Sequence, residues 1–315
     1  MAGSQPVKRP GWHWTAYWSR GRAEVMSIDT PTGPRALDTS ALWSGFFETF
    51  PAGARLLDLA TGSGEVARYA QAAGRFDVTG VDYADIPPTP AGEAGPTFIG
   101  GVAVEALPFE AATFDGILSQ FGIEYADHRP ALAELSRVLK PGGRARLLVH
   151  HADSVITQQA RAQMKAYDAV LGSGAAVRLG RRAFAAQGKA DATARAASHA
   201  AFAQAVTKCR TLIGTGPAFD TVTYMASYLS DLADRIAAYE PSSGLARLDD
   251  FEFGNAAWRH RQLCQTRAAL DIEGLERFLA RAEGVGLSVT ARTLEHDAYG
   301  ALLGWRIDLS KPPQD

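Results

Sequence analysis

The sequence predicts an α/β fold: a doubly wound, seven-stranded, mostly parallel sheet with a terminal antiparallel hairpin, plus a helical insertion. Three observations predict it. Strand-like apolar runs alternate with helix-like segments between Ala54 and Ala152, as in parallel sheets with crossover helices. The segment from about Ser154 to Thr266 is rich in alanine and arginine and has few strand signals. Two strand-like runs follow close together, and a short connection permits an antiparallel pair.

Each expected element follows from a local pattern. The run ARLLDLA at 54–60 is apolar and ends at a glycine-containing turn, which is typical of a buried parallel strand. The helix expected at 130–139 stops at Lys140-Pro141-Gly142-Gly143, a proline and glycine stop. The other expected strands are 76–82, 97–105, 114–121, 144–150, 287–294 and 301–309, and the other expected helices are 64–73 and 272–282.

These elements suggest three regions. Residues 1–53 are rich in aromatic side chains and are expected to form a helical cap, with two helices separated by the turn-rich segment 29–34. Residues 54–152 and 267–315 are expected to form the α/β domain. The insertion, residues 153–266, is much longer than an ordinary loop. We expect it to form a helical lid over the carboxyl ends of the strands.

Composition limits the possible partners and compartments. Of the 315 residues, 46% are hydrophobic and the net charge is −2, so a large core is expected and no basic patch points to nucleic acid. No window approaches the roughly 20 apolar residues that span a bilayer, so no membrane partner is expected. The two cysteines, Cys209 and Cys264, lack metal-ligand spacing, which indicates no metal and a cytoplasmic, reducing environment.

The strongest local signal is the segment from Leu57 to Gly64, which ends the first strand and opens a helix. Glycines there allow a ligand to approach the backbone, and a helix N-terminus offers free N–H groups. Asp82 closes the next strand, close to the spacing at which an acid accepts ribose hydroxyls. The first crevice of the sheet is therefore predicted to bind a nucleoside.

Two cofactors fit that description. The run from Gly62 to Ala67 satisfies the GxGxxG/A spacing of NAD-binding proteins. Asp58 argues against NAD, because a carboxylate before the turn would repel a pyrophosphate but would attract an ammonium group. S-adenosylmethionine carries such an ammonium and no phosphate, so it is the favoured cofactor.

The motifs also resemble a known family. Asp58-Leu59-Ala60-Thr61-Gly62-Ser63-Gly64 resembles motif I of the class I S-adenosylmethionine-dependent methyltransferases, and Asp82 resembles their ribose-binding acid. The segment Glu105–Phe109 followed by Phe114-Asp115 resembles the "EALPF…FD" block of the ubiquinone/menaquinone-biosynthesis-like (methyltransferase type 11) branch. Leu139–Gly143 resembles the turn before the fifth strand of that fold.

The resemblance implies a set of cofactor-binding residues. Asp58 and Gly62 would face the methionine end, Asp82 would hold the ribose, and Tyr83 would lie near the adenine or ribose. The rest of the expected set is Ala60, Thr61, Gly64, Val104, Glu105, Ser119, Gln120 and Phe121, the last three beneath the sulfonium. Ala103 stands where the family often has an aspartate, which implies adenine recognition through backbone groups.

Further candidates lie outside these motifs. Tyr17 and Arg22 belong to the aromatic N-terminal segment. That segment is either core packing or a flap from which both residues reach the methionine carboxylate. His150 and His151 end the fifth strand and are the candidate catalytic bases. Successive strand residues point to opposite faces, so at most one of them enters the site.

The expected activity is methyl transfer to a small, hydrophobic or aromatic molecule, with oxygen favoured over carbon or nitrogen. The fourth strand continues as Ser119-Gln120-Phe121-Gly122, unlike the Asn/Asp-Pro-Pro-Tyr/Phe run of enzymes that methylate bases. A non-catalytic binding or scaffold protein, a protein or RNA methyltransferase and an NAD-dependent oxidoreductase remain as alternatives. A homodimer through the aromatic N-terminal helices is also possible.

Overall fold

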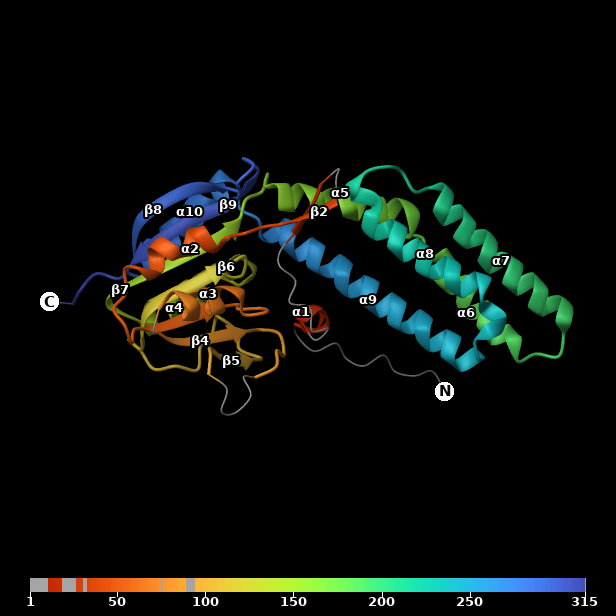
Figure 1. Ribbon diagram of the computed structural model, residues 1–315, viewed down its shortest axis with the longest axis horizontal. Coiled ribbons are helices and arrows are strands. Elements are labelled where there is room, and N and C mark those ends of the chain that lie inside the picture. Colours follow the sequence, from red (N-terminus) through yellow and green to blue (C-terminus); the bar gives the residue numbers. More distant parts are fainter. Residues whose placement is uncertain (1–10, 19–26, 31–32, 75, 89–93, 315) are drawn as a thin grey trace. The chain divides into compact units, whose positions relative to one another are not determined.

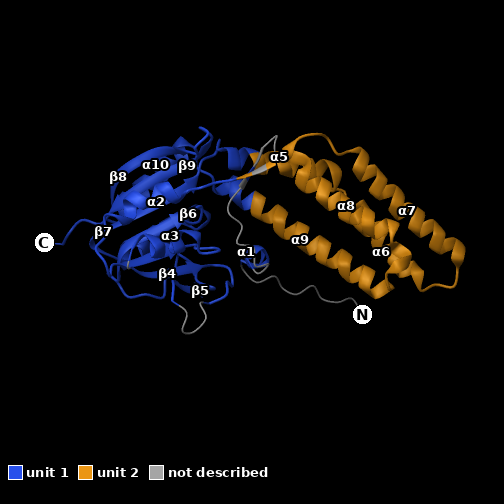
Figure 2. Cartoon of the chain, viewed as in Figure 1, with its two compact units in different colours: residues 1–28, 36–158, 263–315 blue, residues 29–35, 159–262 orange. Residues whose placement is uncertain are grey.

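The computed structural model describes residues 11–18, 27–30, 33–74, 76–88 and 94–314 (Figure 1). The chain divides into two compact units (Figure 2). Unit 1 comprises residues 1–28, 36–158 and 263–315, and unit 2 comprises residues 29–35 and 159–262.

Unit 1 contains the expected seven-stranded sheet, in the order β5-β4-β3-β6-β7-β9-β8. Neighbouring strands from β5 to β7 are parallel, and β9 pairs antiparallel with both β7 and β8. The last strand of the chain therefore lies inside the sheet and β8 forms its edge. The strands are β3 (Arg55–Leu59), β4 (Asp77–Asp82), β5 (Thr97–Gly100), β6 (Phe114–Gln120), β7 (Leu139–His150), β8 (Ser288–His296) and β9 (Leu302–Ser310).

Helices cover both faces of this sheet, as a doubly wound fold requires. One face packs against α2 (Ser40–Phe47) and α3 (Glu65–Ala73), and the other packs against α4 (His128–Val138) and α10 (Ile272–Gly284). Successive residues of one strand serve the two cores: Leu56 belongs to the first and Leu57 to the second, and both are fully buried. The apolar run of β3 reflects burial on both faces.

Two strands differ by five residues at one end from the sequence-based expectation. β7 begins at Leu139 rather than at residue 144, because Leu139 already pairs with Phe114 and an irregularity in the ladder absorbs the glycines that follow. β5 ends at Gly100 rather than continuing to residue 105. In both cases the neighbouring strand decides where pairing starts and stops, which a single segment does not reveal.

An ion pair holds the terminal hairpin to the centre of the sheet. The Arg146 guanidinium on β7 donates two hydrogen bonds to the Asp308 carboxylate on β9, at 2.7 and 2.9 Å. It also donates to the Leu42 carbonyl at 2.6 Å and lies 4.9 Å from the centre of the Phe46 ring. Arg146 thus ties two antiparallel strands to helix α2.

The N-terminal region differs from expectation in one respect. The expected helices are present as α1 (Trp12–Trp18) and α2, but the segment between them contains two short paired strands, β1 (Ser27–Thr30) and β2 (Gly33–Ala36). The turn-rich segment 29–34 was expected only to separate the two helices, and the pairing of β1 with β2 was not predicted.

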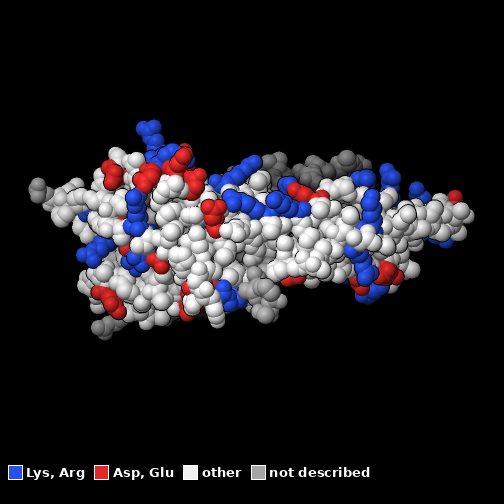
Figure 3. Space-filling model, turned by 90° about the horizontal axis from the view of Figure 1, so that it is seen from above, with Lys and Arg blue, Asp and Glu red and all other residues white. Residues whose placement is uncertain are grey.

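The insertion is helical, as expected, and its helices form a core of their own. That core is lined by large buried side chains such as Phe184, Phe202 and Leu229, each fully inaccessible. Its helices are α5 (Val155–Val170), α6 (Ala175–Gln187), α7 (Ala192–Thr211), α8 (Asp220–Asp234) and α9 (Pro241–Ala268). Among the described residues, no helix is long and apolar enough to cross a membrane. On the face shown in Figure 3, acidic and basic side chains are interspersed.

Candidate active site

The predicted site lies where β3 and β4 end side by side. Asp58, near the end of β3, is in register with Gly80 of β4, and the Thr61 N–H donates to the Val81 carbonyl at 2.9 Å. The two carboxylates expected to bind the cofactor, Asp58 and Asp82, therefore stand at the same edge of the sheet. This is the position at which open α/β sheets bind ligands.

Asp58 is a buried acid without a cation beside it among the described residues. Its side chain is 2% exposed, and its Oδ2 accepts a hydrogen bond from the Thr61 hydroxyl at 2.6 Å. Burial raises the pKa of Asp58 to about 7, while Thr61 lowers it and the charges of Asp82 and Glu65 raise it further. A buried carboxylate of this kind gains stability from a positively charged ligand group.

Asp82 organises the backbone around the same edge. Its Oδ2 accepts from the Gly62 N–H at 2.8 Å, and its Oδ1 accepts from the Ala84 N–H at 2.7 Å. Burial raises the pKa of Asp82, and the two backbone donors oppose that shift. Each carboxylate oxygen has a second lone pair, so the side chain can hold the loops and still accept a hydroxyl group.

The turn between these acids requires glycine. Gly62 has φ +55° and Gly64 has φ +83°, both in the left-handed region. Gly64 is also the N-cap of α3, and a Cβ there would lie 2.3 Å from the Phe98 ring. The sequence pattern therefore reflects both backbone conformation and close packing.

Helix α1 lies over this turn. The Trp18 indole is so close to Gly62 that a Cβ on the glycine would lie 2.5 Å from Trp18 Cζ2. At the other end of the helix, Gly11 contacts the Tyr83 ring and the Thr15 hydroxyl accepts from the Asp85 N–H at 3.0 Å. The aromatic N-terminal segment is thus part of the site region.

Of the two candidates from this N-terminal segment, Tyr17 lies on α1. The ring of Tyr17 packs edge-on against that of Trp18, with ring centroids 4.6 Å apart. Arg22 lies outside the described residues.

The three candidates that end β6 are held by protein contacts. The fully buried Ser119 hydroxyl donates to the Leu59 carbonyl at 3.0 Å. The Gln120 amide accepts from the Trp43 indole N–H at 2.8 Å and donates to Glu65 at 3.1 Å. Only Phe121, which has φ +51°, turns toward the end of β7, where it stacks on His150.

The remaining cofactor candidates follow the ends of β3 and β5. Ala60 directly follows β3 and has φ +54°, a conformation uncommon for a residue with a side chain. Val104 is buried in the core. Glu105 accepts from the N–H of Asp127 at 2.9 Å and so ties its loop to the start of α4. Two non-glycine residues with positive φ, Ala60 and Phe121, therefore end the adjacent strands β3 and β6.

The histidine pair divides as the alternation of a strand requires. His150 is 3% exposed, and its ring stacks on Phe121 with centroids 4.3 Å apart. His151 points elsewhere: its ring packs on Trp305 and its Nδ1 accepts from the Asp153 N–H at 2.8 Å. Burial lowers the pKa of His150 to about 3 and also lowers that of His151. Because its pKa is lowered in this way, His150 is a weak base, and a hydrogen-bonding role suits it better than that of a catalytic base.

A further acid, Glu124, stands beside His150. Its Oε1 accepts from the His150 backbone N–H at 2.9 Å, and the side chain is 3% exposed. Burial raises the pKa of Glu124 to about 7, against the smaller effect of nearby backbone N–H groups. Glu124 was not among the residues predicted from the sequence. The available signal was a carboxylate within the otherwise apolar run from Phe121 to Ala126.

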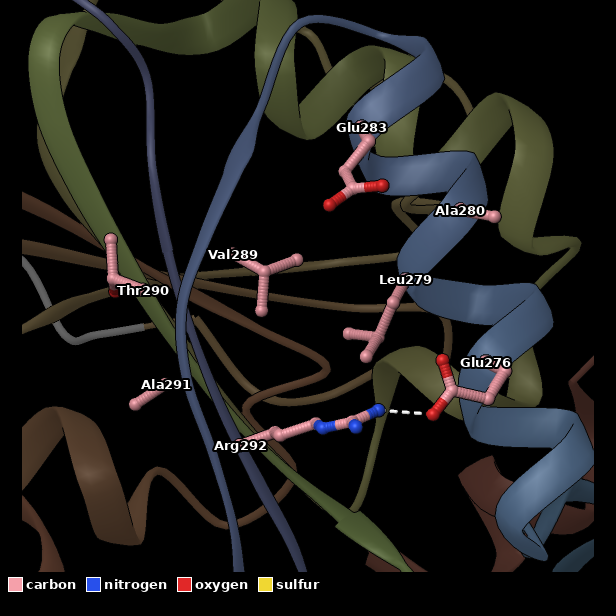
Figure 4. Close-up of a pocket in the computed structure, with 8 residues that line it drawn as sticks. All are labelled: Glu276, Leu279, Ala280, Glu283, Val289, Thr290, Ala291 and Arg292. Atoms are coloured by element: carbon pink, nitrogen blue, oxygen red, sulfur yellow. Dashed lines mark hydrogen bonds and ion pairs between the residues drawn. The ribbon is translucent and has the colours of Figure 1, made fainter.

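A groove between α10 and β8 is distinct from this site (Figure 4). It is lined by Glu276, Leu279, Ala280, Glu283, Val289, Thr290, Ala291 and Arg292, and an ion pair joins Arg292 to Glu276. The edge strand β8 is separated from β3 by β6, β7 and β9. The groove therefore takes no part in the crevice described above.

Comparisons with known proteins agree with this geometry. Residues 57–147 match the family model described as "Methyltransferase domain". The chain is 38% identical over 106 residues to a ubiquinone/menaquinone biosynthesis C-methyltransferase of Geobacter sulfurreducens, covering 30% of this chain and 41% of that protein. It is 40% identical over 99 residues to a demethylmenaquinone methyltransferase of Thermus thermophilus, covering 29% and 44%. The chain thus spans less than half the length of these curated relatives.

A solved S-adenosylmethionine-dependent methyltransferase of Methanococcus maripaludis aligns with 88% of this chain and 86% of its own, at 13% identity and a TM-score of 0.41.

The sheet, the acid–glycine turn and the family match define a class I S-adenosylmethionine-dependent methyltransferase domain. Within that class, this part of the chain is similar to methyltransferases of ubiquinone and menaquinone biosynthesis. The cofactor of this methyltransferase class is S-adenosylmethionine. The residues fit this cofactor, because the buried Asp58 carboxylate would attract its ammonium group, whereas the same charge would repel a pyrophosphate.

Proposed function

We propose that the whole chain is a methyltransferase that uses S-adenosylmethionine to methylate a small, hydrophobic or aromatic molecule. The observation that carries this proposal is the pair of buried acids, Asp58 and Asp82, on either side of the left-handed glycine turn at Gly62. This arrangement offers a charge for an ammonium, an acceptor for ribose hydroxyls and a close approach to backbone.

The proposed roles of the chain's residues follow from their positions. Asp58 would bind the ammonium and Asp82 the ribose. Helix α1, through Trp18, would exclude water from the turn. The cofactor, when bound, supplies an electrophilic methyl group. Positioning of the acceptor and exclusion of water would provide much of the rate acceleration.

The acceptor is proposed to be a small organic molecule, with neither nucleic acid nor membrane as partner. Oxygen is the favoured acceptor atom, because ionisable groups gather at the ends of β6 and β7, where Glu124 and His150 meet. Carbon is the second candidate, because a relative matched by this chain is named a C-methyltransferase of quinone biosynthesis. The two products are isomers of equal mass, and the NMR chemical shift of the transferred methyl group distinguishes them, because a methyl group on oxygen resonates well downfield of one on an aromatic carbon.

We also propose roles for the helical insertion and for helix α1. The helical insertion is proposed to be a lid that selects the acceptor, and α1 to be a flap over the cofactor. A homodimer, a cytoplasmic location and the reach of Arg22 to the methionine carboxylate stay predictions.

The first experiment is thermal unfolding with S-adenosylmethionine, S-adenosylhomocysteine and NAD(H) at matched concentrations. A ligand that binds only the native state raises the midpoint. We expect both adenosyl compounds to raise it, NAD(H) to have no effect, and Asp58→Asn to reduce the shift. Glu283→Gln, at an exposed position of α10, is the matched control. If neither adenosyl compound stabilises the protein, the proposed function is wrong.

A further inference from the structure

Two neighbouring side chains at the ends of β6 and β7 each carry a buried polar atom without a partner. Glu124 Oε2 and His150 Nδ1 have no hydrogen-bond partner among the described residues. Both side chains are 3% exposed, and the Glu124 carboxylate is joined to the His150 backbone through its other oxygen. A buried polar atom without a partner is costly. Two together indicate a place for a polar ligand atom.

The surroundings of this pair are aromatic. The Phe121 ring stacks on the imidazole of His150, and the Tyr125 ring meets it edge-on with centroids 6.0 Å apart. The Trp14 ring of α1 packs edge-on against Tyr125 at 5.1 Å. Glu124 and His150 therefore lie within a cluster of aromatic rings. This cluster is at the same end of the sheet as the glycine turn after β3.

The charges around Glu124 distinguish it from a structural acid. Among the described residues, only backbone N–H groups favour its ionised form, and no cation contributes. By contrast, Glu134 on α4 is paired with Arg137 at 2.6 Å, and Asp115 on β6 is paired with Lys140 at 2.7 Å. A carboxylate left without such a partner is suited to receive a proton from a ligand.

We propose that Glu124 Oε2 accepts the proton of a hydroxyl group on the methyl acceptor, with His150 Nδ1 as the second hydrogen-bonding atom of the same subsite. The acceptor would then be a phenol-like molecule whose ring fits among Phe121, Tyr125 and Trp14. This inference rests on the proposed function and names its acceptor class. It assigns the proton-accepting role to Glu124 rather than to either histidine.

The proton moves directly from the acceptor hydroxyl to the Glu124 carboxylate. The O–H bond of the acceptor breaks and its electron pair stays on the acceptor oxygen. The proton forms an O–H bond with Glu124, whose carboxylate becomes a neutral carboxyl group. His150 remains neutral and orients the oxygen.

The test uses the full-length protein saturated with S-adenosylhomocysteine and two probes, 2-naphthol and 2-methoxynaphthalene. The probes share a ring system, and only the first has a hydroxyl to donate. Affinity is measured by titration calorimetry at pH 6 and pH 8. Because the hydroxyl favours the ionised carboxylate, and the pKa of Glu124 is about 7, we expect 2-naphthol to bind about tenfold more tightly at pH 8.

The other groups near Glu124 do not produce this change. His150 stays neutral at both pH values, and burial raises the pKa of Tyr125 and of Cys264 above their ordinary ranges. Burial lowers the pKa of His128, whose Nε2 lies 3.2 Å from the Glu124 carbonyl oxygen. A contribution from His128 would affect both probes equally, so 2-methoxynaphthalene serves as its control.

Glu124→Gln should make 2-naphthol binding independent of pH, whereas the exposed control Glu283→Gln should leave the tenfold change intact. The wild-type comparison of the two probes needs no variant, so it decides the matter even if Glu124→Gln fails to fold. The inference is overturned if 2-naphthol does not bind, or if it binds wild type equally at both pH values. Failure of S-adenosylhomocysteine to bind would instead contradict the proposed function itself.

Discussion

The indole of Trp18 rests on the backbone of Gly62, so closely that a methyl group on the glycine would lie 2.5 Å from Trp18 Cζ2. Gly62 also has φ +55° and donates its N–H to Asp82. One residue therefore links the aromatic N-terminal helix, the turn after β3 and the acid after β4. The glycine is required by the conformation of the turn and by the helix that covers it.

This relationship gives the first prediction. Gly62→Ala should lower the free energy of unfolding by more than Gly53→Ala does. Both sites have positive φ, which costs about 1–2 kcal/mol for alanine, but a Cβ on Gly53 meets nothing within 4 Å. Overpacking against Trp18 should add about 1–3 kcal/mol at Gly62 alone.

A double-mutant cycle checks the cause. In a Trp18→Ala background, Gly62→Ala should cost no more than Gly53→Ala, as measured by chemical denaturation. Equal losses for the two single glycine variants would mean that Trp18 does not rest on this turn in solution.

The second prediction concerns the pH dependence of cofactor binding. Since burial raises the pKa of Asp58 to about 7, binding of an ammonium group below that pH requires loss of a proton. The affinity for S-adenosylhomocysteine should rise about tenfold per pH unit below pH 7 and level off above it. Asp58→Asn should bind more weakly at pH 8 and show no such rise.

The control for this measurement is 5′-methylthioadenosine, which has the nucleoside but lacks the amino-acid end. Its affinity should not follow the ionisation of Asp58. If both compounds show the same pH dependence, the ammonium does not bind at Asp58 and the orientation proposed for the cofactor is wrong.

Much of the fold follows from the sequence because its signals are local. The apolar run of β3, the glycines of the turn and the proline–glycine stop after α4 each act within a few residues. The strand order near the chain's end was not predictable in this way. Whether β8 or β9 pairs with β7 depends on contacts between distant residues, such as Arg146 with Asp308.

The candidate site, like the fold, was predictable only where its signals are local. Strand periodicity predicted that at most one of His150 and His151 would face the site region, but did not say which. Which of the two histidines faces the site region is determined by the pairing of His150 with Gly304 on β9, and no local sequence pattern reveals this pairing. Glu124 was missed because its significance lies in burial without a cation, a property of the folded environment rather than of spacing.

The third prediction tests the link between the terminal hairpin and the sheet. Arg146→Ala leaves the Asp308 carboxylate, 17% exposed, without its close partner. A lost hydrogen-bonded charge pair of this kind should lower the free energy of unfolding by about 2–3 kcal/mol. The exposed pair of Arg277 with Glu273 on α10 is the control, and Arg277→Ala should change stability little. A similar effect for both variants would show that the buried pair contributes no more than a surface one.

The last prediction separates the two buried groups of the proposed acceptor subsite by the sign of their effect on stability. The folded-state pKa of Glu124 is raised from 4.5 to about 7, so the native protein binds more protons than the unfolded chain in that interval. The contribution of Glu124 to stability therefore falls as the pH rises from about 4.5 to 7.

The pKa of His150 is lowered from 6.5 to about 3, so the native protein binds fewer protons between those values. Its contribution to stability is lost at low pH and increases as the pH rises toward 6.5. Relative to wild type, Glu124→Gln should thus become more stable from pH 5 to pH 8, and His150→Asn should become less stable from pH 4.5 to pH 6.5. For each variant, the difference in the free energy of unfolding from wild type should change by at most about 1.4 kcal/mol per pH unit. Urea unfolding across this range measures both, and slopes of the same sign would contradict the burial of one of the two groups.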